Sequence, residues 1–478
     1  MNQALVVTWA SLEPVVPELL LITVAIALIG FDLFLPRQRI ILPWLTVLGC
    51  LTALAMVAGA EPVKAFGGMF VGDGYAKVFK CICLGSVLLT TLMSEHFQKT
   101  AGMQSGEFYY LMLLSTVGML VMASAGDFMV LYLGLELMAL PLYAMVGLHK
   151  KDGRTSEAAI KYFLMGGFAS ALLLLGLSLV YGLTGTTSIP QVAALITSLD
   201  LQTNPALYAA LALMLAGLGF KVAAAPFHLW TPDVYEGAPT IVTTFMSVGP
   251  KAAGFAILGR AIMTGMPQLQ DQWGPLVAVL AILTMAVGNI TALCQTSLKR
   301  MLAYSSIAHA GYALLGLLGE TGTGMAATMS YLCIYLFMNT GAFAILMVLA
   351  RRDNLAESLE DCRGLATRDP LAAALMLVFL FSLIGIPPTG GFMGKFYLLQ
   401  TAFTAGYTLT VLAAVVFSAI SAYFYLRVVR LMYMAEGQDN RAVNYSPGML
   451  AALTLCLLGV LGTGIFPGSL LAWTSHLF

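Results

Sequence analysis

Apolar runs of roughly twenty residues recur along almost the whole of this 478-residue sequence. Each run is long enough to cross the hydrocarbon core of a bilayer as an α-helix. Charged residues make up only 10% of the chain, against about 25% in an average soluble domain. The alternating segments of about ten residues that mark a transmembrane β-barrel are not seen. Because backbone polar groups need internal partners in hydrocarbon, the pattern predicts an all-α polytopic membrane protein.

The apolar runs predict fourteen membrane-spanning helices. They cover residues 15–35, 40–60, 76–94, 108–125, 127–148, 157–183, 207–225, 240–262, 274–293, 298–318, 324–350, 370–404, 409–434 and 447–473. The twelfth run is too long for one straight crossing, and the sequence GIPPTGG at 385–391 interrupts it. An even number of crossings leaves both chain ends on the same side of the membrane.

Lysine and arginine gather on one side of the membrane when the N-terminus is placed outside. The outer side then holds Lys64, Lys77, Lys80 and Arg260. The opposite loops hold fifteen basic residues: Arg37, Arg39, Lys99, Lys150, Lys151, Arg154, Lys299, Arg300, Arg351, Arg352, Arg363, Arg368, Arg427, Arg430 and Arg441. Since basic loops stay cytoplasmic, this bias predicts that both termini lie on the outer side.

Several ionisable residues fall inside the predicted spans, where a charge facing lipid costs about 3 kcal/mol or more. They are Glu136, Lys161, Lys221, Lys251, His309 and Lys395. Glu136, Lys251 and His309 fall near mid-membrane, Lys221 and Lys395 lie beside two helix interruptions, and Lys161 is nearer the cytoplasmic end of its span. These residues are expected to face the bundle interior, which is typical of a proton or ion path.

A purely structural explanation exists for each of these residues. Glu157 lies four residues before Lys161, a favourable ion-pair spacing on a helix, so a structural salt bridge is an alternative there. His309 is compatible with a hydrogen-bonded histidine packed between helices, and the other four with structural pairing of buried charges. His228 and Asp233, which follow the first interruption, fit either the site or a solvated loop.

The two interruptions divide the predicted spans at equivalent places. Pro226 ends the seventh span, and Pro387, Pro388, Gly390 and Gly391 break the twelfth. Irregular backbone at membrane depth is tolerated only where it is buried in protein or lines a hydrated cavity. Interrupted helices five spans apart indicate two inverted five-helix repeats, spans 4–8 and 9–13. The predicted segments are an N-terminal three-helix part at 1–107, repeats at 108–262 and 274–434, and a C-terminal helix at 447–478.

A lysine beside a hydrated break can exchange a proton, and a movable carboxylate nearby can control the exchange. Approach of Glu136 to Lys221 would hold the proton on the lysine, and withdrawal would release it. The row Glu136–Lys221–Lys251–His309–Lys395 is therefore predicted to relay protons laterally. The predicted site is this row together with Lys161.

The sequence gives no sign of a bound cofactor or metal. Its seven cysteines are scattered without a CxxC pair, which argues against zinc, haem or an iron–sulfur cluster. The stretch GGFMGKF near Lys395 lacks the spacing of a phosphate-binding loop. A formal net charge of 0 indicates no nucleic-acid partner, and no basic region precedes the first apolar run as a cleaved signal peptide would require.

Three stretches together resemble the antiporter-like membrane subunits of respiratory complex I and of Mrp-type cation/proton antiporters. They are GFKVAAAPFHLWTPDVYEGAPT, SSIAHAGY and GIPPTGGFMGKFYLL, and the similarity extends over essentially the whole chain. The family's glutamate on the fifth helix is matched by Glu136, and its lysines on helices six, seven, eight and twelve by Lys161, Lys221, Lys251 and Lys395. Lysine at 395 distinguishes the chain from the subunit M type, which carries glutamate there, and the short end after span 14 distinguishes it from the subunit L type.

The resemblance implies one proton-pumping channel within a large complex in a bacterial inner membrane. Its partners would be other membrane subunits, including neighbouring antiporter-like ones, and membrane lipid. No cofactor is expected in this chain; flavin, iron–sulfur clusters and quinone are expected in partner subunits. A subunit of an Mrp-type antiporter without redox partners is the alternative, and a membrane scaffold whose buried charges only pair is a third.

Overall fold

The computed structural model describes residues 12–35, 40–102, 105–199, 203–350, 357–437 and 444–475. Twelve helices in these ranges are long and apolar enough to cross a membrane. They are built on α2 (Val16–Phe34), α3 (Ile41–Gly59), α4 (Gly74–Ala101), α6 (Phe128–Val146), α7 (Gly153–Thr184), α9 (Pro205–Val222), α11 (Thr240–Leu258), α12 (Gln270–Leu293), α13 (Leu298–Leu314), α14 (Thr321–Leu349), α18 (Thr408–Met434) and α19 (Pro447–Ile465). The protein is thus a mostly helical polytopic membrane protein, as predicted.

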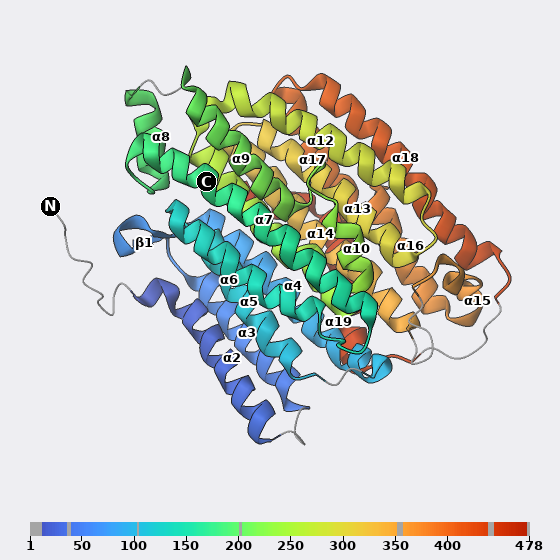
Figure 1. Ribbon diagram of the computed structural model, residues 1–478. Helices are drawn as coiled ribbons and strands as arrows, with labels where there is room; N and C mark the ends of the chain where they lie inside the picture. The colour runs from blue at the N-terminus through green and yellow to red at the C-terminus, as the bar shows by residue number, and fades with distance from the viewer. Residues whose placement is uncertain are drawn as a thin grey trace.

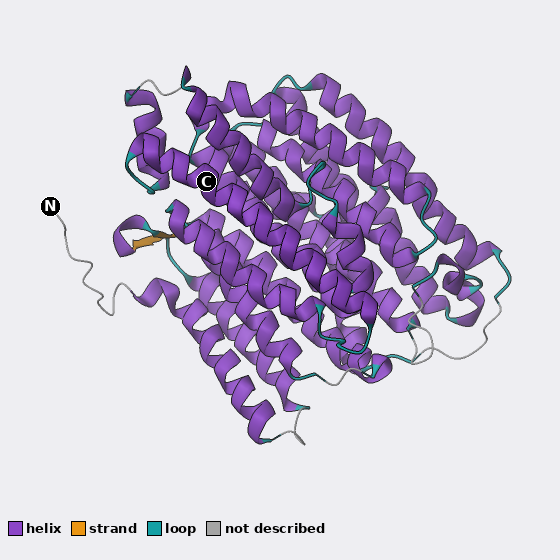
Figure 2. Cartoon of the chain, viewed as in Figure 1, coloured by secondary structure: helices purple, strands orange, loops and turns teal. Residues whose placement is uncertain are grey.

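The helices run side by side in an elongated bundle, with α2 at one edge and α18 at the opposite edge (Figures 1 and 2). Every residue of α11 is buried, and α13 and α14 are almost as fully enclosed. The outer helices instead present exposed apolar side chains such as Phe168 and Leu409, as expected of surfaces that face lipid. A charged side chain on α11 is therefore surrounded by protein.

Shorter helices complete the bundle. They are α5 (Glu107–Ala123), α8 (Ile189–Ser198), α10 (Trp230–Gly237), α15 (Leu365–Arg368), α16 (Pro370–Ile384), α17 (Gly390–Thr404) and α20 (Pro467–Ser475). Helix α8, which lies between α7 and α9, was not predicted because its ten residues are too few for a spanning run. Helices α19 and α20 were predicted as one span at 447–473, whereas the chain turns at Phe466.

A small hairpin was also missed. The antiparallel strands β1 (Val63–Ala65) and β2 (Phe70–Gly72) lie between α3 and α4. The backbone of β2 and its turn bonds to the α5–α6 connection: Val71 N donates to Ser124 O and Gly126 N to Met69 O. The hairpin therefore ties the N-terminal helices to the rest of the bundle.

The chain leaves helical geometry at both predicted interruptions. Helix α9 ends at Val222, where Ala223 adopts a left-handed conformation, and α10 begins at Trp230. Helix α16 ends at Ile384, followed by Gly385 with a φ of 91°, and α17 begins at Gly390. Prolines in both connections cannot donate a backbone N–H, so neither pair of helices can fuse into one straight rod.

The second interruption should tolerate no side chain at Gly391. A Cβ there would lie 1.8 Å from Ser382 O, so Gly391→Ala must push α17 away from α16. Overpacking of this kind costs roughly 1–3 kcal/mol, and we expect a lower midpoint in thermal unfolding of the detergent-solubilised protein. Gly167→Ala on α7 is the control, because nothing lies within 4 Å of its Cβ position. Equal midpoints for the two variants would contradict the close contact.

Candidate functional site

The predicted relay residues lie on different helices but mostly within the bundle interior. Lys221 is on α9, Lys251 on α11, His309 on α13 and Lys395 on α17, and each is no more than 6% exposed. Glu136, on α6, is partly exposed. Four of the five members of the predicted row are therefore shielded from lipid, as their cost at membrane depth requires.

Lys251 connects the two halves of the chain directly. Its Nζ donates to Ser306 O on α13 at 2.6 Å and also contacts the Ser306 hydroxyl. The Tyr335 ring of α14 lies 5.8 Å from the same Nζ, within the range of a cation–π contact. The ammonium therefore has polar partners, and no carboxylate of the described residues lies within ion-pair distance of it.

His309 is bonded through both ring nitrogens. Nδ1 lies 2.5 Å from the Tyr331 hydroxyl, and Nε2 lies 3.2 Å from the Tyr425 hydroxyl. Tyr425 also bonds the Ser305 hydroxyl, one residue before the serine that binds Lys251. A neutral imidazole can donate at one nitrogen and accept at the other, so this arrangement can pass a proton through the ring.

Lys395 occupies the second helix break. Its Nζ donates to Leu383 O at 3.0 Å, to Ile384 O at 2.8 Å and to the Ser418 hydroxyl at 3.1 Å. Both carbonyls belong to the end of α16, which the break leaves without helical partners. The Tyr312 ring lies 4.5 Å from the ammonium. The lysine thus satisfies backbone groups that the interruption exposes.

Glu136 and Lys221 do not form a direct ion pair, since no contact within 4.0 Å joins these two described residues. Glu136 instead accepts a hydrogen bond from the Ser170 hydroxyl of α7. The Nζ of Lys221 has no hydrogen-bond partner among the described residues, although the Glu136 charge acts on it electrostatically. The predicted closeness is therefore limited to electrostatic range, with the carboxylate held on the α7 side.

Lys161 lies in a surface network of charges rather than in the buried row. Its Nζ pairs with Glu157 at 2.8 Å and with Asp233 of α10 at 3.0 Å, and its side chain is 42% exposed. Arg300 of α13 pairs with Asp233 and Glu236, and these residues line a cavity of about 260 Å³. The predicted pairing with Glu157 is present. Asp233 is part of a helix and not of a loop.

His228 is not in a solvated loop. It lies in the turn between α9 and α10 and is 8% exposed, and its Nδ1 has no partner among the described residues. The Ala225 N–H donates a hydrogen bond to the Thr284 hydroxyl of α12 at 2.9 Å, and this bond holds the turn in place. Residues 223–225 and His228 of the break are buried, whereas Pro226 and Leu229 are exposed, a difference that the sequence order alone does not reveal.

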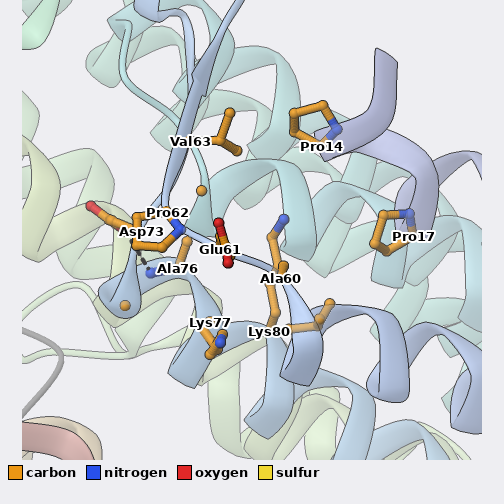
Figure 3. A pocket seen from close by; sticks show the side chains of 13 residues that line it. Pro14, Pro17, Ala60, Glu61, Pro62, Val63, Asp73, Ala76, Lys77 and Lys80 are labelled. Carbon is orange, nitrogen blue, oxygen red and sulfur yellow. Dashed lines mark hydrogen bonds between the residues drawn. The ribbon is translucent and has the colours of Figure 1, made fainter. Parts of the chain in front are cut away.

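Three of the basic residues predicted on the outer side lie in helices, within the predicted spans 76–94 and 240–262. Lys80 on α4 forms a buried ion pair with Glu18 at 2.6 Å, and Arg260 on the π-helical turn Gly259–Thr264 bonds Asp73 through two nitrogens, at 2.8 and 2.7 Å. Lys77 lies on α4 one turn before Lys80. A cavity of about 300 Å³ opens beside these residues, with Asp73, Lys77 and Lys80 on its wall (Figure 3). These ion pairs were not predicted, because the two partners of each pair are far apart along the sequence.

Many basic residues predicted in cytoplasmic loops also lie within helices. They are Lys99, Arg154, Lys299, Arg300, Arg368, Arg427 and Arg430. The helices therefore extend beyond the apolar runs. This is compatible with a membrane, because long basic side chains near helix ends can reach the membrane surface. Others lie outside the described residues: Arg37, Arg39, Arg351, Arg352 and Arg441.

The hydroxyl groups that contact the row were not predicted. They belong to Ser170, Ser306, Tyr331, Ser418 and Tyr425, and the Ser305 hydroxyl in turn contacts Tyr425. Serine and tyrosine are common in ordinary helix packing, so their types carry no signal until the neighbouring helices are known. Among the described residues, no group of three or more His, Cys, Asp or Glu side chains is arranged to hold a metal ion.

Fold and site define a polytopic membrane protein in which ionisable residues are buried around two interrupted helices. Residues 125–421 match the family described as NADH:quinone oxidoreductase/Mrp antiporter, TM, and the chain belongs to this family. It is 56% identical to NADH-quinone oxidoreductase subunit N of Desulfovibrio desulfuricans, with 98% of this chain and 97% of the relative covered. It is 43% identical to subunit N of Trichlorobacter lovleyi, over 98% and 96%.

Solved structures share the fold. A chain of respiratory complex I from Thermus thermophilus is 36% identical, with a TM-score of 0.81 over 95% of this chain and 98% of that chain. A chain of the Mrp complex from Dietzia has a TM-score of 0.83 over 98% and 97% at 22% identity, which establishes a likeness of fold alone.

Proposed function

We propose that the chain is a proton-translocating, non-redox membrane subunit of an NADH:quinone oxidoreductase, of the subunit N type. Protons pass along Glu136, Lys221, Lys251, His309 and Lys395 while quinone is reduced in other subunits. The observation that carries this proposal is the contact of Lys251 with Ser306, because it joins a buried lysine of the first half to α13 of the second half, the helix that carries His309. Lys161 lies on the cytoplasmic side, where protons enter the row.

Fourteen crossings in two inverted repeats account for the helices. Helix α5 has 17 residues, one short of a full candidate span, and α16 with α17 makes one interrupted crossing. A Cβ on Gly118 of α5 would lie 2.2 Å from Met138 N in α6, and a Cβ on Gly288 of α12 would lie 2.5 Å from Ala308 N in α13. Each contacted residue follows its glycine by twenty positions, which supports equivalent helix pairs at the start of each repeat. The segments are 1–107, 108–262, 274–434 and 447–478.

The membrane, the sides of the two termini and the partner subunits follow from this assignment. The membrane is the bacterial inner membrane, both termini are periplasmic, and the partners are other membrane subunits, including antiporter-like neighbours, and lipid. Flavin, iron–sulfur clusters and quinone belong to partner subunits, and this chain holds no cofactor. The Mrp-type alternative is supported by the shared family description and by a fold likeness at 22% identity, whereas the relatives at 56% and 43% identity are subunits N.

Purification of the tagged chain with its natural partners tests the assignment. We expect flavin, iron–sulfur signals and NADH-dependent quinone reduction to co-purify with it, and proton uptake into proteoliposomes to accompany the reaction. A complex that lacks these redox groups and exchanges sodium for protons would instead establish the Mrp-type function.

A further inference from the structure

The cavity of about 300 Å³ beside Lys77 and Lys80 lies where the start of α2, the end of α3 and the start of α4 meet (Figure 3). Much of its wall is apolar, and proline and aliphatic side chains form this part: Pro14, Pro17, Val57, Ala60, Pro62 and Val63. Four charged residues also line it: Glu61, Asp73, Lys77 and Lys80. An apolar wall with a few polar groups is typical of a site that binds a small amphipathic molecule.

Two of the four charges already have partners in the protein. Asp73 accepts hydrogen bonds from two nitrogens of Arg260 and a third from Ala76 N, which caps α4. Lys80 pairs with Glu18 of α2 at 2.6 Å, and both side chains are buried. These two ion pairs hold the helix ends together and leave no net charge for a ligand.

The other two charges have no ion-pair partner among the described residues. Lys77 Nζ donates to Ala58 O at 2.9 Å, and the remaining N–H groups of its ammonium are available. Glu61 follows the end of α3 and is exposed. The cavity therefore offers one cation and one anion on a wall that is otherwise apolar or neutralised. A molecule that carries one charge of each sign complements this wall.

The lipid-facing surface of the bundle leads to the cavity. Leu19 of α2, two residues after Pro17, is 42% exposed, and Met56 of α3, next to Val57, is 40% exposed. Both helices are long and apolar enough to span a membrane, and the cavity lies at their ends. The polar headgroups of a bilayer lie at this depth, with the acyl chains along the helices below them.

We propose that this cavity binds the headgroup of a zwitterionic phospholipid with a primary ammonium, of the phosphatidylethanolamine type. The phosphate pairs with Lys77, the ammonium donates to the Glu61 carboxylate, and the acyl chains lie along Leu19 and Met56. Because the cavity wall comes from α2, α3 and α4, one lipid holds the first three spanning helices together. No residue of the proposed proton relay lines the cavity, so the inference is independent of that function.

The two charges make different predictions for lipid selectivity. The assembled complex, stripped of lipid in detergent, is titrated with phosphatidylethanolamine or with phosphatidylglycerol, and the bound lipid is counted by native mass spectrometry. Lys77→Gln should weaken binding of both lipids at this site about tenfold, because both carry the phosphate. Glu61→Gln should weaken only phosphatidylethanolamine, so that the preference of the wild type for this lipid is lost. Lys77→Arg keeps the charge and should bind as the wild type does.

Two matched controls lie beside the cavity but do not line it. Lys64→Gln removes an exposed cation next to Val63, and Glu13→Gln removes an exposed anion next to Pro14. Both variants should bind the two lipids as the wild type does. If Lys77→Gln and Glu61→Gln also bind as the wild type does, the cavity is not the lipid site.

A soluble competitor and a density map complete the test. Glycerophosphoethanolamine has the same headgroup without acyl chains and should not displace the lipid at equal concentration; if it does, the ligand is a soluble phosphoester and the lipid assignment is wrong. A high-resolution map of the wild-type complex should show a phosphate with its oxygens about 2.7–3.2 Å from Lys77 Nζ. Protein density in the cavity would overturn the proposal.

Discussion

Replacement of Lys251 by methionine should abolish most NADH-driven proton pumping while the complex still assembles. Lys251 is the buried lysine through which α11 of the first half donates a hydrogen bond to Ser306 of the second half. Methionine keeps a similar length and apolar stem but cannot hold a proton. A positioned proton-transfer group is worth at least about a hundredfold in rate, so we expect a loss of tenfold or more, to be measured as proton uptake and quinone reduction in proteoliposomes.

Two further variants control this result. Lys64→Met on β1 makes the same substitution outside the row and should leave turnover unchanged. Ser306→Ala removes the hydroxyl but keeps the backbone oxygen as an acceptor, so its effect should be smaller than that of Lys251→Met. Wild-type pumping in Lys251→Met would show that protons do not cross between the halves through α11.

Much of the helix arrangement could be predicted because the bilayer imposes simple rules on a sequence. A run of about twenty apolar residues has few structures other than a spanning helix, and proline within such a run must interrupt it. The ends of α9 and α16 follow from Pro226 and Pro387 in this way. Helix α8 and the hairpin β1–β2 escaped prediction because short elements between spans obey no comparable length rule.

The site was predictable in its residue types but not in its contacts. Burial of Lys221, Lys251, His309 and Lys395 follows from the cost of a charge in lipid. Which oxygens each residue meets depends on how α13, α16 and α18 pack against it, and no local sequence pattern encodes that packing. The buried pair of Lys80 with Glu18 illustrates the same limit, because the partners come from α4 and α2.

Lys395→Arg should assemble and yet lower coupled turnover by about tenfold, because a guanidinium hardly deprotonates in a protein. The hydrogen bonds of Lys395 to Leu383 O and Ile384 O make this variant more informative than methionine. Methionine would leave Leu383 O without the lysine donor, while Ile384 O would keep its bond from the Ser418 hydroxyl. The loss of a donor to a buried polar group costs about 1–3 kcal/mol and confuses a structural loss with a functional one. Arginine keeps the charge and the donors, so only the exchangeable proton is removed.

The chain offers a matched control for a cation that satisfies helix-end carbonyls. Arg427 on α18 donates to Leu293 O at 3.0 Å and to Gln295 O at 2.5 Å, outside the proposed row. The reverse exchange, Arg427→Lys, should leave both assembly and pumping close to wild type. Proton release and quinone reduction measured together in proteoliposomes distinguish the two roles of Lys395. If Lys395→Arg is as silent as Arg427→Lys, then Lys395 only stabilises the broken helix, and the relay ends at His309 or earlier.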